Sequence, residues 1–494
     1  MEALTKLSAA KMREGLLSGD FSAVELTEAH LNQIESSGAE LNDFTSICNE
    51  EASEAAKIAD KRLKEEKENS PTLTGLPVAV KDMLLTKGIR TTCSSKMLEN
   101  FIPPYSATVV EKIEQNGGVV IGKTNHDEFG MGASSEHSIF GPVKNPWDHQ
   151  RVPGGSSGGS AVAVAAGHAP LALSTDTGGS IRQPASFTGV VGLKPTYGRV
   201  SRYGVIAFAS SLDQVGPHAR TVDDTAILLE AISGRDERDS TSIDLEVPNY
   251  FSNLQSAKKE SLKGLRVGLP KEYFVDGLEA DVEAKIREAA KVLEEEGAEL
   301  VDISLPHTSA ALPVYYIIAP AEASSNLARY DGVRYGHRAE NLKSLGELYE
   351  RSRSEGFGDE VQRRILIGSY VLSAGYCDAF YNKALQVRTL IIDDFKSAFQ
   401  NSCDVILAPV CPSTAFKIGE LSNSPLKMYL QDVLTTPASL AGLPGISVPY
   451  SLDSKGLPIG VQLLAPHFGE EILLKVAERI ERRASFDNTK FCIE

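Results

Sequence analysis

The sequence is poor in the features that would indicate a membrane, a disulfide framework or a structural metal. Its six cysteines are scattered along 494 residues and none form a CxxC pair, so neither a zinc site nor disulfides are predicted. Cysteines used in this way favour a reducing compartment. No stretch approaches the roughly 20 continuous apolar residues of a membrane span. Residues 1–17, MEALTKLSAAKMREGLL, predict an amphipathic helix and lack the features of a signal or transit peptide. We therefore expect a cytoplasmic protein, bacterial rather than organellar, without membrane contact.

Basic charge is also scarce, because 50 Lys and Arg face 66 Asp and Glu and leave a net charge of −16. The cationic stretches, such as KRLKEEKE at 61–68, are interleaved with acids and are typical of a solvated helix face. A protein that binds nucleic acid by itself usually carries a basic stripe. Direct and unaided binding of RNA is therefore disfavoured.

Helices and strands alternate along the chain. Ala23, Leu26, His30 and Ile34 mark one face of a helix, and a second helix is expected over 52–67. Strands are expected at 76–82, 118–125, 265–270, 298–306, 404–409, 445–450 and 460–466, and further helices at 108–117, 160–167, 281–297 and 470–483. This pattern predicts an α/β fold with a mostly buried sheet. The polar, poorly periodic stretch 233–264 is expected to be a surface excursion.

The most unusual segment is GGSSGGS at 154–160. Core-like sequence, SAVAVAAG at 160–167, follows it directly, which argues against a flexible linker. The segment lacks the lysine of a phosphate-binding P-loop and the glycine spacing of a dinucleotide fingerprint. It does match the GxSxG nucleophile elbow at 154–158, but small-residue segments often match by chance, and an elbow needs a histidine and an acid as partners.

A second glycine-rich segment, DTGGSIRQPA, begins at Asp176. An aspartic protease would need two such DTG motifs, and the chain has one. Backbone N–H groups around Gly178 and Gly179 could instead converge on an oxyanion, with Ser180 as nucleophile. None of the nine histidines lies in a motif that pairs obviously with Ser180. Lys81 is the other candidate base, because it ends a predicted strand and burial among apolar neighbours would lower its pKa.

Taken together, Lys81, GGSSGGS and DTGGSIRQPA resemble the amidase signature family, whose serine hydrolases use a Ser–Ser–Lys triad. The resemblance implies one domain over 1–494 and a central mixed, largely parallel, twisted sheet with helices on both faces. Within that domain we expect an N-terminal helical segment at 1–70, the signature core at 71–220, and the remainder of the sheet with the substrate-binding residues at 265–494. The resemblance makes Lys81 the general base, Ser180 the nucleophile and Ser156 the bridging serine after a cis peptide bond. It also implies an oxyanion hole at Thr177, Gly178, Gly179 and Ser180, with Asp176 and Arg182 bracing that loop.

Five longer segments are similar to one branch of that family, the A subunits of aspartyl/glutamyl-tRNA amidotransferases: residues 96–113, 194–217, 322–336, 353–368 and 434–449. This resemblance implies glutamine as substrate, bound by Tyr315, Arg364 and Asp432. The residue types fit, because free glutamine carries a carboxylate for an arginine and an ammonium for an acid. Arg363 is adjacent and leaves the arginine assignment open. In TNHDEFGMG (124–132), His126 and Gly130 differ from the residues common in relatives, and we expect neither to touch the triad.

The same branch implies a glutaminase that supplies ammonia to a partner. In that arrangement, the B subunit converts Glu-tRNA(Gln), Asp-tRNA(Asn) or both with ATP and magnesium, a small C subunit clasps the other two, and charged tRNA is reached mainly through the B subunit. No metal or cofactor is expected in this chain. Two alternatives stay open: a stand-alone amidase acting on small or aryl amides, and a scaffold that keeps the fold without catalysis.

Overall fold

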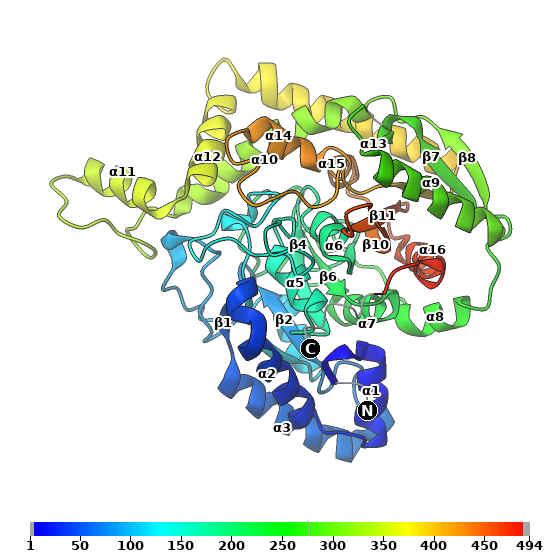
Figure 1. Cartoon of the computed structure of the whole chain (residues 1–494). Coiled ribbons are helices and arrows are strands. Elements are labelled where there is room, and N and C mark those ends of the chain that lie inside the picture. Colours follow the sequence, from blue (N-terminus) through cyan, green and yellow to red (C-terminus); the bar gives the residue numbers. More distant parts are fainter. Residues whose placement is uncertain (1–3, 275, 488–494) are drawn as a thin grey trace.

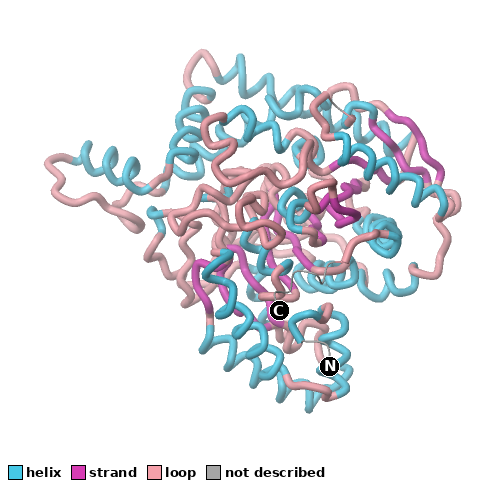
Figure 2. Tube along the Cα trace, in the orientation of Figure 1, coloured by secondary structure: helices cyan, strands magenta, loops and turns pink. Residues whose placement is uncertain are grey.

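The computed structural model describes residues 4–274 and 276–487, and within them eleven strands form one sheet that is accompanied by sixteen α-helices (Figures 1 and 2). The strands are β1 Phe44–Ile47, β2 Pro77–Lys81, β3 Val119–Thr124, β4 Leu171–Asp176, β5 Val191–Lys194, β6 Gln214–Ala219, β7 Arg266–Pro270, β8 Glu299–Ile303, β9 Val405–Pro409, β10 Gly445–Leu452 and β11 Pro458–Leu464. The helices are α1 Ala9–Ser18, α2 Ala23–Leu41, α3 Asn49–Glu66, α4 Thr108–Gln115, α5 Gly158–Ala165, α6 Arg182–Thr188, α7 Val222–Ile232, α8 Tyr250–Ala257, α9 Ala280–Glu295, α10 Ala311–Asn326, α11 Leu345–Gly356, α12 Asp359–Val371, α13 Lys383–Asn401, α14 Pro425–Tyr429, α15 Thr436–Leu440 and α16 Glu470–Arg483.

The sheet is mixed, as predicted, with the strand order β1-β3-β2-β4-β6-β5-β10-β11-β9-β7-β8. Its parallel pairs form two blocks, β3-β2-β4 and β9-β7-β8. Six of the ten strand pairs in the described residues are antiparallel, a larger share than we expected. Part of the reason is the connection from β10 to β11, because residues 453–457 are too few for the crossover that a parallel pair requires.

Helices cover both faces of the sheet. Every residue of β9 is buried, and its side chains alternate between two cores. Val405 and Leu407 lie in a core with residues of α7, α9 and α16, whereas Ile406 and Ala408 lie in a core with residues of α10, α13 and α15. The strand is therefore covered from both sides, which explains its continuous apolar sequence.

The predicted helices and strands are largely confirmed. Ala23, Leu26, His30 and Ile34 are all buried along α2, which begins with a capping box between Ser22 and Glu25. Every residue of α5 is buried, as the sequence of 160–167 predicts. The stretch 233–264 is mostly exposed or half-buried but contains α8. None of the helices in the described residues is long and apolar enough to cross a membrane.

The parallel block β3-β2-β4 positions the candidate site. Because the three strands run in the same direction, their last residues, Thr124, Lys81 and Asp176, lie at one edge of the sheet. The glycine-rich segment ends in α5 and the loop after β4 ends in α6, so both loops reach the same edge. Ligand sites of α/β proteins commonly lie at this edge.

Candidate active site

Lys81 is fully buried at the end of β2 and donates to three hydroxyl groups. Its Nζ lies 2.8 Å from the Oγ of Ser156, 2.8 Å from the Oγ of Ser157 and 2.8 Å from the Oγ1 of Thr175. Burial lowers the pKa of Lys81 to about 7, and the negative charges of Asp127 and Asp176 partly oppose that shift. A large fraction of this lysine is therefore neutral near neutral pH and can accept a proton.

The surrounding hydrogen bonds distinguish Ser156 from its two companions. The Ser157 hydroxyl donates to the backbone oxygen of Thr175 at 2.9 Å, and the Thr175 hydroxyl is directed to the Sδ of Met83 at 3.1 Å. Within the described residues, the Ser156 hydroxyl donates no such bond to another acceptor. Of the three, Ser156 is the one whose proton is uncommitted and can pass to neutral Lys81.

The Gly155–Ser156 peptide bond is cis, as the resemblance implied. The Gly155 N–H donates to Oε1 of Gln183 at 2.8 Å, and the Ser156 carbonyl accepts from the Asp127 N–H at 3.2 Å. A Cβ at position 155 would lie 2.2 Å from Oδ2 of Asp127, so only glycine fits there. The turn that presents Ser156 is thus held by Gln183 of α6 and by the loop that contains Asp127.

Ser180 lies in the next loop, 7% exposed, at the turn that leads into α6. Its carbonyl accepts from the Ser157 N–H at 3.3 Å, which joins this loop to the glycine-rich one. The hydrogen bonds of the described residues do not include one between the Ser156 and Ser180 hydroxyls. The structure therefore brings Lys81 and Ser156 into direct contact and places Ser180 in the adjoining loop.

The backbone N–H groups of Gly178, Gly179 and Ser180 donate none of the hydrogen bonds found in the described part of the chain, so they are free to bind an oxyanion. Gly179 has φ +149°, and a Cβ there would lie 2.2 Å from Oγ1 of Thr435. The Gly178 carbonyl accepts from that same hydroxyl at 2.6 Å. At the start of the loop, the Thr177 hydroxyl donates to Asp213 at 2.7 Å. The loop is therefore fixed through its carbonyl and side chains.

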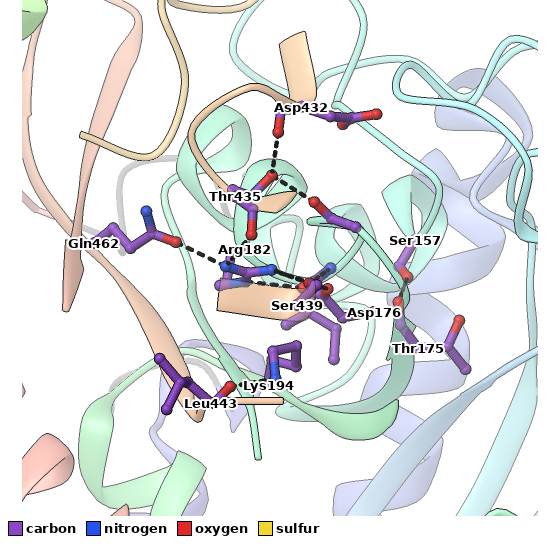
Figure 3. Close-up of polar contacts among 12 residues, drawn as sticks. Ser157, Thr175, Asp176, Arg182, Lys194, Asp432, Thr435, Ser439, Leu443 and Gln462 are labelled. Carbon is purple, nitrogen blue, oxygen red and sulfur yellow. Dashed lines mark hydrogen bonds and ion pairs between the residues drawn. The ribbon is translucent and has the colours of Figure 1, made fainter. Parts of the chain in front are cut away.

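Asp176 and Arg182 form a buried ion pair across the base of this loop, as Figure 3 shows. Arg182 donates from Nε to Oδ2 at 3.0 Å and from Nη2 to Oδ1 at 3.1 Å. Its remaining donors reach Gln462, Ser439 and the backbone oxygen of Thr435. Asp176 also accepts from the N–H of Ile181, at 3.2 Å. The pair connects the end of β4 with the start of α6 in the geometry expected of bracing residues.

Arg364 is buried in α12, and its guanidinium carbon lies 5.3 to 5.5 Å from the ring centres of Phe208, Tyr316 and Tyr429. Its Nε donates to Glu360 at 2.8 Å, and within the described residues its two Nη groups form no hydrogen bond. Arg363 also pairs with Glu360, but its side chain is 42% exposed. This difference favours Arg364 over Arg363 as the residue that meets a substrate carboxylate.

Asp432 and Tyr315 both contact Tyr316 of the same aromatic group. Asp432 accepts from the Tyr316 hydroxyl at 3.0 Å, and burial raises the pKa of Asp432 to about 7 against the opposing effects of that bond and of Arg364. Tyr315 packs against the oxyanion loop, since a Cβ at Gly178 would lie 2.6 Å from its ring. The Asp432 carbonyl accepts from the Thr435 N–H at 3.2 Å. One acid and one arginine thus stand close to the oxyanion loop.

Several residues of the site were not found from the sequence. They are Ser157, Thr175, Gln183, Asp213, Glu360 and Thr435, which act through contacts with residues distant in the chain. Ser157 alone had a local signal, as the second serine of GGSSGGS. Gly130 lies near the triad, because a Cβ added at that position would be 3.7 Å from Oγ of Ser156. His126 is buried as well, and the charge of Lys81 contributes to the lowering of its pKa.

A buried lysine bonded to a serine at the strand edge of an α/β sheet, beside a loop of free N–H groups, defines a serine hydrolase that uses lysine in place of histidine. The model of the amidase family matches residues 25–474. The chain belongs to the amidase family.

Relatives of known name match almost the whole chain. The A subunit of glutamyl-tRNA(Gln) amidotransferase from Chromohalobacter salexigens is 56% identical over 479 residues, covering 97% of this chain and 96% of the relative. A protein of the same name from Desulfatibacillum aliphaticivorans is 55% identical over 485 residues and covers 98% of each chain. The crystal structure of the A subunit of glutamyl-tRNA(Gln) amidotransferase from Thermotoga maritima superposes with a TM-score of 0.79 at 41% identity, covering 99% of this chain and 97% of that one.

Proposed function

We propose that this chain is the glutamine-hydrolysing subunit of a tRNA-dependent amidotransferase. The observation that carries the proposal is the pairing of two sites. Lys81, which is partly neutral near pH 7, is hydrogen-bonded to Ser156 beside the loop that carries Ser180. Arg364 and Asp432 both contact Tyr316, and the adjacent Tyr315 packs against that loop. An enzyme for apolar amides has no use for a buried arginine and a buried acid at this place, whereas free glutamine offers a carboxylate to the arginine and an ammonium to the acid.

The proposed reaction begins with two proton transfers. Neutral Lys81 takes the proton of Ser156, and Ser156 takes the proton of Ser180, whose Oγ attacks the side-chain amide carbon of glutamine. The negative oxygen of the tetrahedral intermediate is bound by the N–H groups of the 177–180 loop. The carbon–nitrogen bond breaks as a proton returns through Ser156 to the nitrogen, and ammonia leaves. Water then hydrolyses the glutamyl ester on Ser180 and yields glutamate.

The names of the relatives extend the proposal to partners. In it, ammonia passes to a B subunit, which binds ATP and magnesium and converts Glu-tRNA(Gln), Asp-tRNA(Asn) or both, while a small C subunit joins the two. Charged tRNA is then contacted mainly by the B subunit. The net charge of −16 on this chain agrees with that division, because a polyanion such as tRNA is repelled by an acidic surface.

The test is ammonia release from glutamine by the chain assembled with the B and C subunits, with and without charged tRNA and ATP. Ser180→Ala is expected to lower this rate by at least about 1,000-fold, because the nucleophile is lost. Retention of the wild-type rate by that variant would disprove the assignment of Ser180. Turnover of simple amides without any partner, together with indifference to glutamine, would favour the stand-alone amidase instead.

A further inference from the structure

Glu128 is a buried carboxyl group that the proposed mechanism does not use. It lies in the TNHDEFGMG segment and is 4% exposed. Its Oε1 accepts from the Ser95 hydroxyl, and its Oε2 accepts from the N–H of Gly358, 230 residues away, at 2.8 Å. Burying a carboxyl group is costly unless its oxygens are bonded, so both contacts have a specific role in holding it.

Gly358 is the residue immediately before α12, and no side chain of α12 itself caps that end. Glu128 therefore supplies the cap from a distant part of the chain, through the oxygen that accepts the N–H of Gly358. Ser95 completes the contact, because its hydroxyl also lies 3.2 Å from the carbonyl of Gly356, the last residue of α11. Hydrogen bonds thus hold both the end of α11, at the Gly356 carbonyl, and the start of α12, at the Gly358 N–H.

Ring packing reinforces the same junction. Phe129, the next residue after Glu128, meets Phe357 edge to face with 5.6 Å between ring centres. The approach is close, since a Cβ at Gly358 would lie 2.5 Å from Oε2 of Glu128. In Figure 1, α11 extends away from the rest of the molecule, so the junction is where this extension meets the core.

Two residues of α12 connect this junction to the candidate substrate-binding residues. Glu360 and Arg364 lie on the first turns of α12, within about 9 Å of rise from Gly358 at 1.5 Å per residue. Glu360 binds Nε of Arg364 at 2.8 Å and the Tyr429 hydroxyl at 2.9 Å. A shift of the first turn would therefore move Arg364 with it.

The residue before Glu128 contacts the loop of the triad. Asp127 accepts from the N–H groups of Ser135 at 2.8 Å and His137 at 3.1 Å, and it lies against Gly155, next to Ser156. Two adjacent carboxyl groups thus connect one short turn with both the triad loop and the start of α12. This turn is thus in contact with the loop of the bridging Ser156 on one side and with the start of the helix that carries Arg364 on the other.

We propose that Glu128 is a positioning residue for substrate selection: by capping α12 through Gly358, it sets the distance between Arg364 and the serine loops, and so selects amides that carry a carboxylate. The proposal rests on the proposed glutaminase function for its substrate. It assigns to Glu128 an effect on the binding of the carboxylate and none on the proton transfers.

The experiment compares Glu128→Ala and Gly358→Ala with the wild-type chain, each assembled with its partner subunits. Both variants are expected to raise the KM for glutamine about tenfold with kcat within about twofold, since the lost contact acts on binding. Hydrolysis of 4-nitrophenyl acetate, which has no α-carboxylate, is expected to stay within about twofold. Backbone hydrogen exchange over residues 358–366 is expected to become faster in both. Gly358→Ala disrupts the contact between Glu128 and Gly358 from the side of the helix. This variant therefore tests the proposal even if Glu128→Ala does not fold.

The matched control is Glu347→Ala, which removes a carboxylate that accepts a backbone N–H at the start of α11, from Lys343 at 2.7 Å. It should change neither the KM nor the exchange of α12. If the variants lost equal activity with glutamine and with the ester, Glu128 would act on the triad and the proposal would be overturned. An unchanged hydrogen exchange of α12, or an unchanged KM for glutamine, would overturn it as well. If the wild-type complex released no ammonia from glutamine, the proposed function would be refuted. The capping role of Glu128 is tested independently of that function by the backbone hydrogen exchange of α12.

Discussion

Two buried residues of the site have pKa values near neutrality for one physical reason: burial disfavours a charge. It lowers the pKa of Lys81 to about 7 and raises that of Asp432 to about 7. The mechanism needs Lys81 neutral and Asp432 charged, and both conditions are met above pH 7. The active form of the free enzyme has therefore lost one proton from Lys81 and one from Asp432. We expect the logarithm of kcat/KM for glutamine to fall with a limiting slope of about two as the pH drops below 7.

The two groups can be separated by the parameter that each affects. In the enzyme–substrate complex, the ammonium of the substrate keeps Asp432 charged. The logarithm of kcat should therefore fall with a slope of about one at low pH, because only Lys81 still titrates. Asp432→Asn should reduce the slope of kcat/KM from about two to about one while KM rises. Steady-state rates between pH 5.5 and 9 test this. A slope near two that persists in Asp432→Asn would assign the second proton to another group.

The neighbouring arginines offer a direct comparison of buried and exposed charge. Arg364→Lys keeps the charge but loses the planar guanidinium, so we expect KM for glutamine to rise by about 10- to 100-fold, as for a lost charge-assisted hydrogen bond. Arg363→Lys should change KM by less than about threefold, because that side chain is 42% exposed. An equal effect of the two changes would mean that the carboxylate binds between them.

At the scale of elements, the ion pair between Asp176 and Arg182 joins β4 to α6 and so fixes the loop that carries Ser180. Removing one partner leaves a buried charge alone, so Arg182→Met is expected to lower the free energy of unfolding by about 3–5 kcal/mol. Urea denaturation measures this. The control is Arg235→Met, which removes an exposed pair with Asp244 and should cost at most about 1 kcal/mol. A loss below about 1 kcal/mol for Arg182→Met would show that the loop is held by its other contacts.

The sequence predicted those elements and contacts whose signal is local. Lys81 at the end of a buried strand, and the all-round burial of α5, follow from short apolar patterns. The antiparallel centre of the sheet does not, because the pattern of a buried strand is the same in either direction. Tyr315, Arg364 and Asp432 came from resemblance alone, since they lie on three separate segments that only the fold brings together. Contacts such as that between Thr435 and Gly178, 257 residues apart, leave no mark in the sequence around either residue.

At the scale of the whole molecule, the candidate site joins two parts with different constraints. The lysine and both serines lie at one edge of the β3-β2-β4 block and its loops, where parallel strands fix them. The candidate substrate-binding residues come from α10, α12 and the segment before α15, which pack on the same core. The residues that do the chemistry and the residues that choose the substrate can therefore vary separately.

The overall charge leads to a prediction about the division of labour in the proposed complex. Affinity for tRNA depends mainly on cations that neutralise phosphates, and weak non-specific binding already has a Kd of about 10⁻⁴ to 10⁻⁶ M. With a net charge of −16, the isolated chain is expected to bind Glu-tRNA with a Kd weaker than about 10⁻⁴ M at physiological salt. Fluorescence anisotropy of labelled tRNA measures this, with the complex containing the B and C subunits as the positive control. A Kd below about 10⁻⁶ M for the isolated chain would show that a local basic surface overrides the net charge, and would place part of the tRNA site on this chain.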